Sequence, residues 1–359
     1  MRSLIEFLPV TLAVALGVLL PLAALAHEGV DHEHAPADAA AVTACVRTGT
    51  GDNTYETVPN WCQIPRGEKT LGPTHGGIVV DKKGLIYFSM DAGPHGILVY
   101  SPDGKFQRGI AEKFTGIHGL AIREEGGEEF IYAAHLAGKQ AVKLKTDGTV
   151  VWKIGFDKLK DSGKYKEQGQ YSPTAIAVGP NGDVYIADGY GQNWIHQFDK
   201  DQKYVRSFGG RGKEPGKFET CHGLALDTRG DKPLLLVCDR ENRRLQHFDL
   251  DGKFVKVVTE NLRRPCSLSF HKDRVVIAEL EARVTILDGQ NKQVAHLGDN
   301  PNKDHWAQYR VPPEQWKPGI FTAPHGVSFD KDGNVYVMDW NESGRVSKLN
   351  RVSQQASAE

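Results

Sequence analysis

The strongest constraint on the fold is a unit of about 40 to 60 residues that recurs six times. Each copy has a short apolar strand, a turn rich in Asp and Gly, a second strand that usually ends in an acidic residue, and a further strand or hairpin. The copies begin with segments 74–91, 117–135, 173–190, 221–242, 265–281 and 324–340. Four short strands per unit at this spacing predict an all-β chain. The predicted fold is a six-bladed β-propeller with four-stranded antiparallel blades around a central channel.

The sixth copy stops after its third strand, which would leave an open sheet edge. We expect segment 54–65, "TYETVPNWCQIP", to supply the missing outer strand and close the ring. The propeller would then span residues 54–352, followed by a tail, 353–359. We expect residues 27–53 to be a flexible segment that bears histidines. Loose metal capture by His27, His32 and His34 is the alternative for its first part.

The first 26 residues predict a secretory signal peptide. Arg2 precedes an apolar run that ends in Ala24, Leu25 and Ala26, a pattern typical of a cleavage site. An uncut membrane anchor is the alternative. Since no second long apolar segment follows, we expect a periplasmic or secreted protein that has no membrane contact after cleavage.

Charge and cysteine content narrow the partners and the covalent structure. The formal net charge is −1 and the basic residues are scattered, so the sequence predicts no nucleic-acid partner. An exported chain can form disulfides. Cys45 and Cys62 flank a polar segment outside the repeats, and we expect these two to pair. Of the three cysteines that remain, at least one is then a free thiol.

The repeat resembles the NHL repeat, in which Asp, Asn, Arg, an aliphatic residue and Phe follow one another in the second hairpin. The fourth copy, "DRENRRLQHF", carries these residues as Asp239, Asn242, Arg244, Leu245 and Phe248. The resemblance implies an NHL-type propeller.

Three histidines fall at one position of the repeat, in alternate copies. Aligned on the start of the innermost strand, the six copies carry Gly76, His118, Thr174, His222, Cys266 and His325. Alternate blades of a six-bladed ring lie about 120° apart. His118, His222 and His325 should therefore converge on the axis at one level, an arrangement that suits Zn²⁺ or another divalent metal with one coordination position left open. The alternative is that His-Gly is only a good entry turn for the strand.

Further polar residues should line the mouth of the channel, where the second strands end. They are His135, Asp188, Asp239, Glu279 and Asp339, together with Tyr190 and Arg240. A Tyr near a metal can act as a general base, and an Arg can hold a carboxylate. For Asp188, Asp239 and Asp339 the alternative is a scaffold role in the repeat. Tyr190 could instead be a lining aromatic, and Arg240 a salt bridge between blades.

Most of residues 70–350 resemble peptidyl-α-hydroxyglycine α-amidating lyases. The similarity is densest in "PTAIAVGPNGDVYIADGYGQNWIHQF", "HGLALDTRGDKPLLLVCDRENRRLQHF" and "APHGVSFDKDGNVYVMD". The resemblance implies His118, His222 and His325 as zinc ligands, Tyr190 as the catalytic Tyr and Arg240 as a substrate-site Arg. It also implies an enzyme that cleaves the C–N bond of a C-terminal α-hydroxyglycine to give an amide and glyoxylate. The partner would be a peptide or small molecule with a C-terminal carboxylate, and we expect a monomer.

The chain departs from this family at three positions. Met90 stands near the place of a first-blade Arg, Gly326 replaces a calcium-binding Asp, and Gly191 replaces a disulfide Cys. The sequence therefore gives no support for calcium, and Cys266, His75 or His95 could add a ligand or an acid–base group. Two other functions stay open: a non-catalytic NHL propeller that binds a protein or glycan, and a metal-dependent hydrolase of lactones or esters.

Overall fold

The computed structural model describes residues 44–352. The predicted signal peptide, the histidines of segment 27–34 and the tail 353–359 lie outside the described residues. Among the residues that the structure does describe, no helix is long and apolar enough to cross a membrane.

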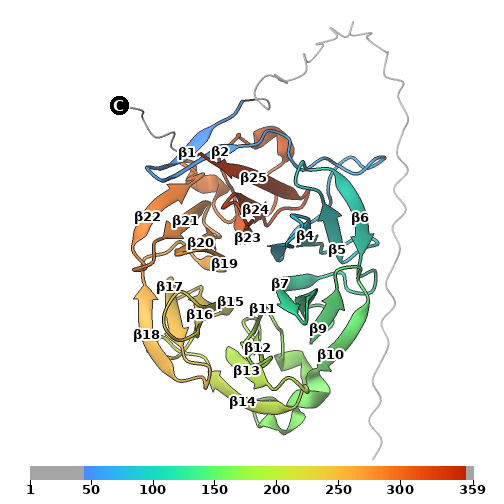
Figure 1. Ribbon diagram of the computed structural model, residues 1–359, viewed down its shortest axis with the longest axis vertical. Coiled ribbons are helices and arrows are strands. Elements are labelled where there is room, and N and C mark those ends of the chain that lie inside the picture. The colour runs from blue at the N-terminus through green and yellow to red at the C-terminus, as the bar shows by residue number, and fades with distance from the viewer. Residues whose placement is uncertain (1–43, 353–359) are drawn as a thin grey trace, which may run out of the picture. The chain divides into compact units, whose positions relative to one another are not determined.

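Six antiparallel sheets follow one another around a ring, and each is one blade of a β-propeller (Figure 1). The first two blades are β3 (Ile78–Val80), β4 (Ile86–Ser89), β5 (Ile97–Tyr100) and β6 (Phe106–Ile110), then β7 (Ile117–Glu125), β8 (Glu128–His135), β9 (Gln140–Lys145) and β10 (Val150–Gly155). The next two are β11 (Ala175–Val178), β12 (Val184–Ala187), β13 (Trp194–Phe198) and β14 (Tyr204–Gly209), then β15 (Cys221–Asp227), β16 (Leu234–Asp239), β17 (Arg244–Phe248) and β18 (Phe254–Thr259). The fifth is β19 (Pro265–His271), β20 (Arg274–Glu279), β21 (Arg283–Leu287) and β22 (Gln293–Leu297). This confirms the predicted fold.

The loops between blades carry short 3₁₀ helices. Within residues 44–352 these are η2 (Phe156–Ser162), η3 (Gln168–Gln170), η4 (Lys303–His305) and η5 (Pro313–Gln315). Asp-Gly turns join the outer strands. At one of them Gly252 has φ 79°, and the Asp249 carboxylate accepts hydrogen bonds from the backbone N–H groups of Asp251 and Lys253. These are the turn residues that a tight hairpin requires.

The core lies between neighbouring blades, because each sheet packs one face on the sheet before it and the other on the sheet after it. Val99 of the first blade, for example, packs with Ile131 and Leu144 of the second. Consecutive innermost strands are also in contact all the way round, from β3 to β7 and so on to β23 and back to β3. The ring is therefore closed.

The last blade is closed by the N-terminal part of the propeller. β23 (Pro324–Phe329), β24 (Val335–Asp339) and β25 (Arg345–Arg351) come from the end of the chain, and β2 (Asn53–Thr57) pairs with β25. β2 is thus the outer strand that the sequence predicts. A fifth strand, β1 (Arg47–Thr50), pairs with β2, and Thr48 Oγ1 accepts a hydrogen bond from the Gly298 N–H of the fifth blade. The sheet therefore begins seven positions before residue 54, within the segment predicted to be flexible.

The predicted disulfide between Cys45 and Cys62 is wrong, since all five cysteines are free thiols. Cys45 is exposed just before β1. Cys62 packs beside the core that contains Trp61, Leu71 and Tyr100. The loop after β2 turns the Cys62 side chain inward, and burial raises the pKa of its thiol to about 12.

Candidate metal centre

Each of the three aligned histidines is the extra residue of a β-bulge at the start of an innermost strand. In the ladder of β7 with β8 the register passes from Ile117 to Gly119 and skips His118. The ladders of β15 with β16 and of β23 with β24 skip His222 and His325 in the same way. A bulge re-aims the side chain of its extra residue. Here it turns three imidazoles out of their own sheets toward the axis.

The glycine after each histidine lets the next innermost strand approach. A Cβ on Gly119 would meet the Thr174 carbonyl oxygen at less than 3.0 Å, and a Cβ on Gly223 would meet that of Cys266. The same two carbonyls are hydrogen-bonded to the Nδ1 atoms of His118 and His222, each at 2.8 Å. The recurring His-Gly pair thus has a structural cause: Gly admits the carbonyl that fixes the preceding His.

These hydrogen bonds define the state of the rings. A carbonyl can only accept, so Nδ1 carries the proton in His118 and His222, and also in His325, whose Nδ1 lies 3.1 Å from the Gly76 oxygen. Burial lowers the pKa of all three imidazoles well below its usual value, so they are neutral. Nε2 is then a free lone-pair donor on each ring. This is how metal-ligating histidines are commonly held.

The three rings lie together. Their centroids are 4.7 Å apart between His118 and His222, 4.7 Å between His118 and His325, and 4.8 Å between His222 and His325. Nε2 of His325 is buried and has no hydrogen-bond partner within the described residues. A buried polar atom without a partner is costly, and a cation among these nitrogens would satisfy it. The donors present therefore suit a divalent metal, but among the described residues each set of ligand atoms within 4.8 Å of one another contains His118 or His222, not both.

Tyr190 reaches the same cluster from the loop after β12. Its hydroxyl lies 3.0 Å from Nε2 of His222 and 3.3 Å from Nε2 of His118. Burial raises the pKa of Tyr190, and the positive charge of Arg240 acts in the opposite direction. The hydroxyl thus faces the nitrogens through which His118 and His222 would bind a metal.

Arg240 is fixed beside this hydroxyl. Its Nη1 donates to Tyr190 Oη at 3.0 Å, and its Nε donates to Glu241 Oε1 at 2.8 Å. Glu241 also accepts two hydrogen bonds from Arg264. One carboxylate thus positions two guanidinium groups next to Tyr190, which suits an anionic ligand.

The other residues predicted at the channel mouth hold the scaffold together. Asp239 pairs with Arg244 at 2.7 Å, and Glu279 with Arg283 at 3.0 Å. Asp339 accepts from two backbone N–H groups, and His135 Nε2 bonds the Thr115 carbonyl. Asp188 accepts from the backbone of Ser172 and Gln192 and from the Tyr165 hydroxyl. All five are buried, and for Asp188, Asp239 and Asp339 this agrees with the scaffold alternative.

Two residues outside the aligned triad join the cluster. Ligand atoms of His75, His118 and His325 lie within 4.8 Å of one another, and so do those of His222, Cys266 and His325. Burial raises the pKa of the Cys266 thiol to about 11, which keeps its sulfur protonated near neutral pH. The position of Cys266 in the alignment predicts its place. His75 lies one residue before Gly76, the aligned position of the first copy. Only this nearness in sequence indicates that it could reach the cluster. His95 lies elsewhere, against Gly109 and near Glu112.

The histidines stand at one end of the central channel. A cavity of about 500 Å³ runs along the innermost strands and is lined by residues of all six, from His118, His222 and His325 to Arg123, Phe270 and Ser328. Tyr190 and Arg240 are not among its lining residues. The side chains suited to a charged ligand therefore lie outside this cavity.

Fold and site together define the class of this protein: an NHL-type six-bladed β-propeller with a cluster of imidazoles on its axis. The model of the NHL repeat matches residues 321–349, in the last blade.

Among curated relatives, the chain is 30% identical to peptidyl-glycine alpha-amidating monooxygenase of Mus musculus over 62% of this chain and 22% of that protein. It is 36% identical to "Probable peptidyl-alpha-hydroxyglycine alpha-amidating lyase" of Caenorhabditis elegans over 21% of this chain and 22% of that one. It is 28% identical to NHL repeat-containing protein 3 of Homo sapiens over 63% of this chain and 67% of that protein. The segments that match this chain therefore make up about a fifth of the length of these amidating relatives.

Solved propellers share the architecture at lower identity. A streptogramin B lyase superposes with a TM-score of 0.53 at 15% identity and covers 85% of this chain and 97% of its own. A gluconolactonase from Xanthomonas campestris superposes with a TM-score of 0.57 at 13% identity, over 87% and 93% of the two chains. At these identities the likeness shows the fold alone.

Proposed function

We propose that this protein is an exported, metal-dependent carbon–nitrogen lyase. Its substrate would be a C-terminal α-hydroxyglycine or a related carbinolamide, and its products an amide and glyoxylate. The observation that carries the proposal is the contact of one phenol, Tyr190 Oη, with Nε2 of His118, Nε2 of His222 and a guanidinium nitrogen of Arg240. Homology to the amidating proteins supports this choice of reaction.

His118, His222 and His325 would hold the metal through Nε2. Lewis-acid polarisation of a substrate oxygen is the chemistry that a divalent metal supplies when it is bound in such a site. Zinc is the first candidate, because three His with one open position are typical of catalytic zinc.

The remaining chemistry falls to the protein's own side chains. Tyr190 is placed to take the proton of the carbinol hydroxyl. As that oxygen forms a carbonyl, the C–N bond breaks, its electron pair passes to nitrogen, and Tyr190 can return the proton to the departing amide nitrogen. Burial raises the pKa of Tyr190 and disfavours the phenolate that this step requires, whereas the positive charge of Arg240 favours it.

Arg240 would bind the substrate carboxylate. Its Nε is engaged by Glu241, which fixes the plane of the guanidinium and directs its Nη atoms toward Tyr190. A carboxylate held there would place the neighbouring carbinol carbon close to the Tyr190 hydroxyl. This favours substrates with a free C-terminal carboxylate.

Glyoxylate release from an N-acyl-α-hydroxyglycine tests the proposal. We expect Tyr190→Phe to lower kcat by about 10²- to 10⁴-fold, the usual contribution of a general base, with the bound metal retained. Tyr204→Phe is the control, because Tyr204 lies on outer strand β14 of the same blade. If the metal-loaded protein released no glyoxylate, the lyase proposal would fail and a binding propeller would be the better account. If Tyr190→Phe were fully active, Tyr190 would not be the base.

A further inference from the structure

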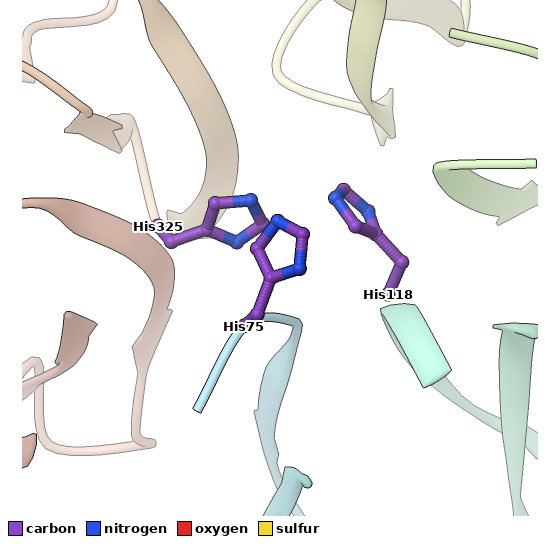
Figure 2. A group of neighbouring side chains, drawn as sticks. All are labelled: His75, His118 and His325. Atoms are coloured by element: carbon purple, nitrogen blue, oxygen red, sulfur yellow. The ribbon is translucent and has the colours of Figure 1, made fainter. Parts of the chain in front are cut away.

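A fourth imidazole, His75, closes the cluster from the first blade. Its ring centroid lies 4.8 Å from that of His118 and 4.6 Å from that of His325. Figure 2 shows the His75 ring between the other two. His75 precedes the ring-level position, Gly76, by one residue. Its ring centroid lies 6.4 Å from that of Tyr190.

A carboxylate lies beside His75. Its Nδ1 lies 3.5 Å from Oδ2 of Asp91, at the end of the first blade's second strand. This leaves Nε2 for the interior of the cluster. A carboxylate on the outer nitrogen of a histidine is a common arrangement around metal ligands, because it fixes the ring and raises its basicity.

The backbone holds His75 less firmly than the other three. His118, His222 and His325 lie within strands and are 2–3% exposed. His75 lies before β3, next to the single bridge between Thr74 and Asn341, and its side chain is 20% exposed. It can move away from the axis at a smaller cost in strand pairing.

We propose that His75 is a fourth, displaceable nitrogen ligand of the metal held by His118, His222 and His325. This inference rests on the metal site of the proposed function but not on the lyase reaction. Nitrogens that share one tetrahedral zinc ion lie about 3.4 Å apart, since each Zn–N bond is about 2.0–2.1 Å. The ligand atoms of His75, His118 and His325 lie within 4.8 Å of one another, so the rings would have to draw closer to share one ion.

A fourth imidazole would limit which substrates can reach the metal. Four imidazoles fill the coordination shell of a tetrahedral zinc and leave no open position. Substrate oxygen would then reach such an ion only when His75 withdraws toward Asp91. His75 would thus exclude ligands that cannot displace it, and Arg240 would favour those with a carboxylate that can.

Cobalt(II) substitution tests this directly, because its visible spectrum and X-ray absorption report the number and type of ligands. We expect four imidazoles on the wild-type ion and three in His75→Ala. We also expect the Co²⁺ affinity of His75→Ala to fall by more than about 10-fold. Asp91→Asn keeps the imidazole and should weaken affinity by about 10- to 100-fold, as loss of an outer partner does. His95→Ala is the matched control, since His95 also faces a carboxylate, Glu112, on the first blade but lies away from the axis.

Each outcome decides a different point. An unchanged ligand count and affinity in His75→Ala would overturn the role of His75, even if the wild-type protein released glyoxylate. Four imidazoles on a protein without lyase activity would keep the role of His75 and remove the proposed reaction. A wild-type protein that binds no cobalt would overturn both. Asp91→Asn answers the question if His75→Ala folds poorly.

Discussion

At the scale of single residues, the His-Gly pair shows how a repeat can build a site. The histidine is the bulged residue, and the glycine gives a carbonyl of the next blade room to approach. The same hydrogen bond fixes the tautomer of the ring and joins neighbouring blades. Neither residue could do this alone, which explains why the two recur together.

A second residue-scale feature is a buried hydrogen-bonded chain behind Tyr190. Asp188 Oδ2 accepts from Tyr165, whose hydroxyl lies 2.6 Å from His196 Nε2, and His196 Nδ1 lies 2.7 Å from Ser207 Oγ. His196 is fully buried. Burial lowers the pKa of His196 to about 3, and burial raises that of Asp188 to about 6.

His196 and Asp188 make the stability of the fold depend on pH in opposite directions. His196 stays neutral in the fold while the unfolded chain takes up a proton, so its contribution is present above about pH 6.5 and is lost as pH falls, by about 1.4 kcal/mol per unit. The raised pKa of Asp188 favours the fold at low pH, and this contribution is lost as pH rises toward 6.

We predict that His196→Gln removes the loss of folding stability that His196 causes as pH falls. Gln246 occupies the equivalent place in the fourth blade and bonds Asp239 there, so the replacement suits the repeat. Urea unfolding between pH 7 and pH 5 should show a shallower loss of stability in His196→Gln than in wild type. Equal slopes would contradict the assignment of His196 as a buried neutral ring.

At the scale of elements, the ring depends on two strands from its N-terminal part. β2 completes the last blade, and Tyr55 on β2 is 3% exposed in a core that also contains Val276, Phe321 and Leu349. β1 covers β2 and bonds the fifth blade through Thr48.

We therefore predict that Tyr55→Ala lowers the free energy of unfolding by about 3–5 kcal/mol, the usual cost of removing a buried aromatic side chain. Arg47→Ala on the same hairpin is the control. Arg47 pairs with Glu56 at the surface, and an exposed ion pair contributes at most about 1 kcal/mol. Urea unfolding compares the variants. If Tyr55→Ala were as stable as Arg47→Ala, β2 would not be needed to close the ring.

At the scale of the whole molecule, most of the architecture is readable from the sequence because a propeller repeats. Six copies of one strand pattern specify six blades, and equivalent positions must lie at equal height on the axis. The alignment therefore predicts that His118, His222 and His325 meet, and it also places Cys266 beside them. The incomplete sixth copy predicts β2.

What the sequence does not predict depends on features that break the repeat. His75 is one residue out of register, yet the loop before β3 brings it to the axis. β1 has no counterpart in other blades, and the loop after β2 turns Cys62 away from Cys45. The acidic residues at the strand ends could not be assigned either, because their scaffold role depends on partners such as Arg244 and Arg283, which are visible only once the strands are paired.

The central claim is that the axial imidazoles bind one metal ion, and elemental analysis of the purified protein tests it most directly. We predict roughly one divalent metal per chain, as a single site built from the axial imidazoles would hold, with the metal lost in His222→Ala. Its retention in His271→Ala is the control, because His271 lies at the far end of innermost strand β19. A wild-type protein without metal, or a His222→Ala variant that keeps it in full, would contradict the account.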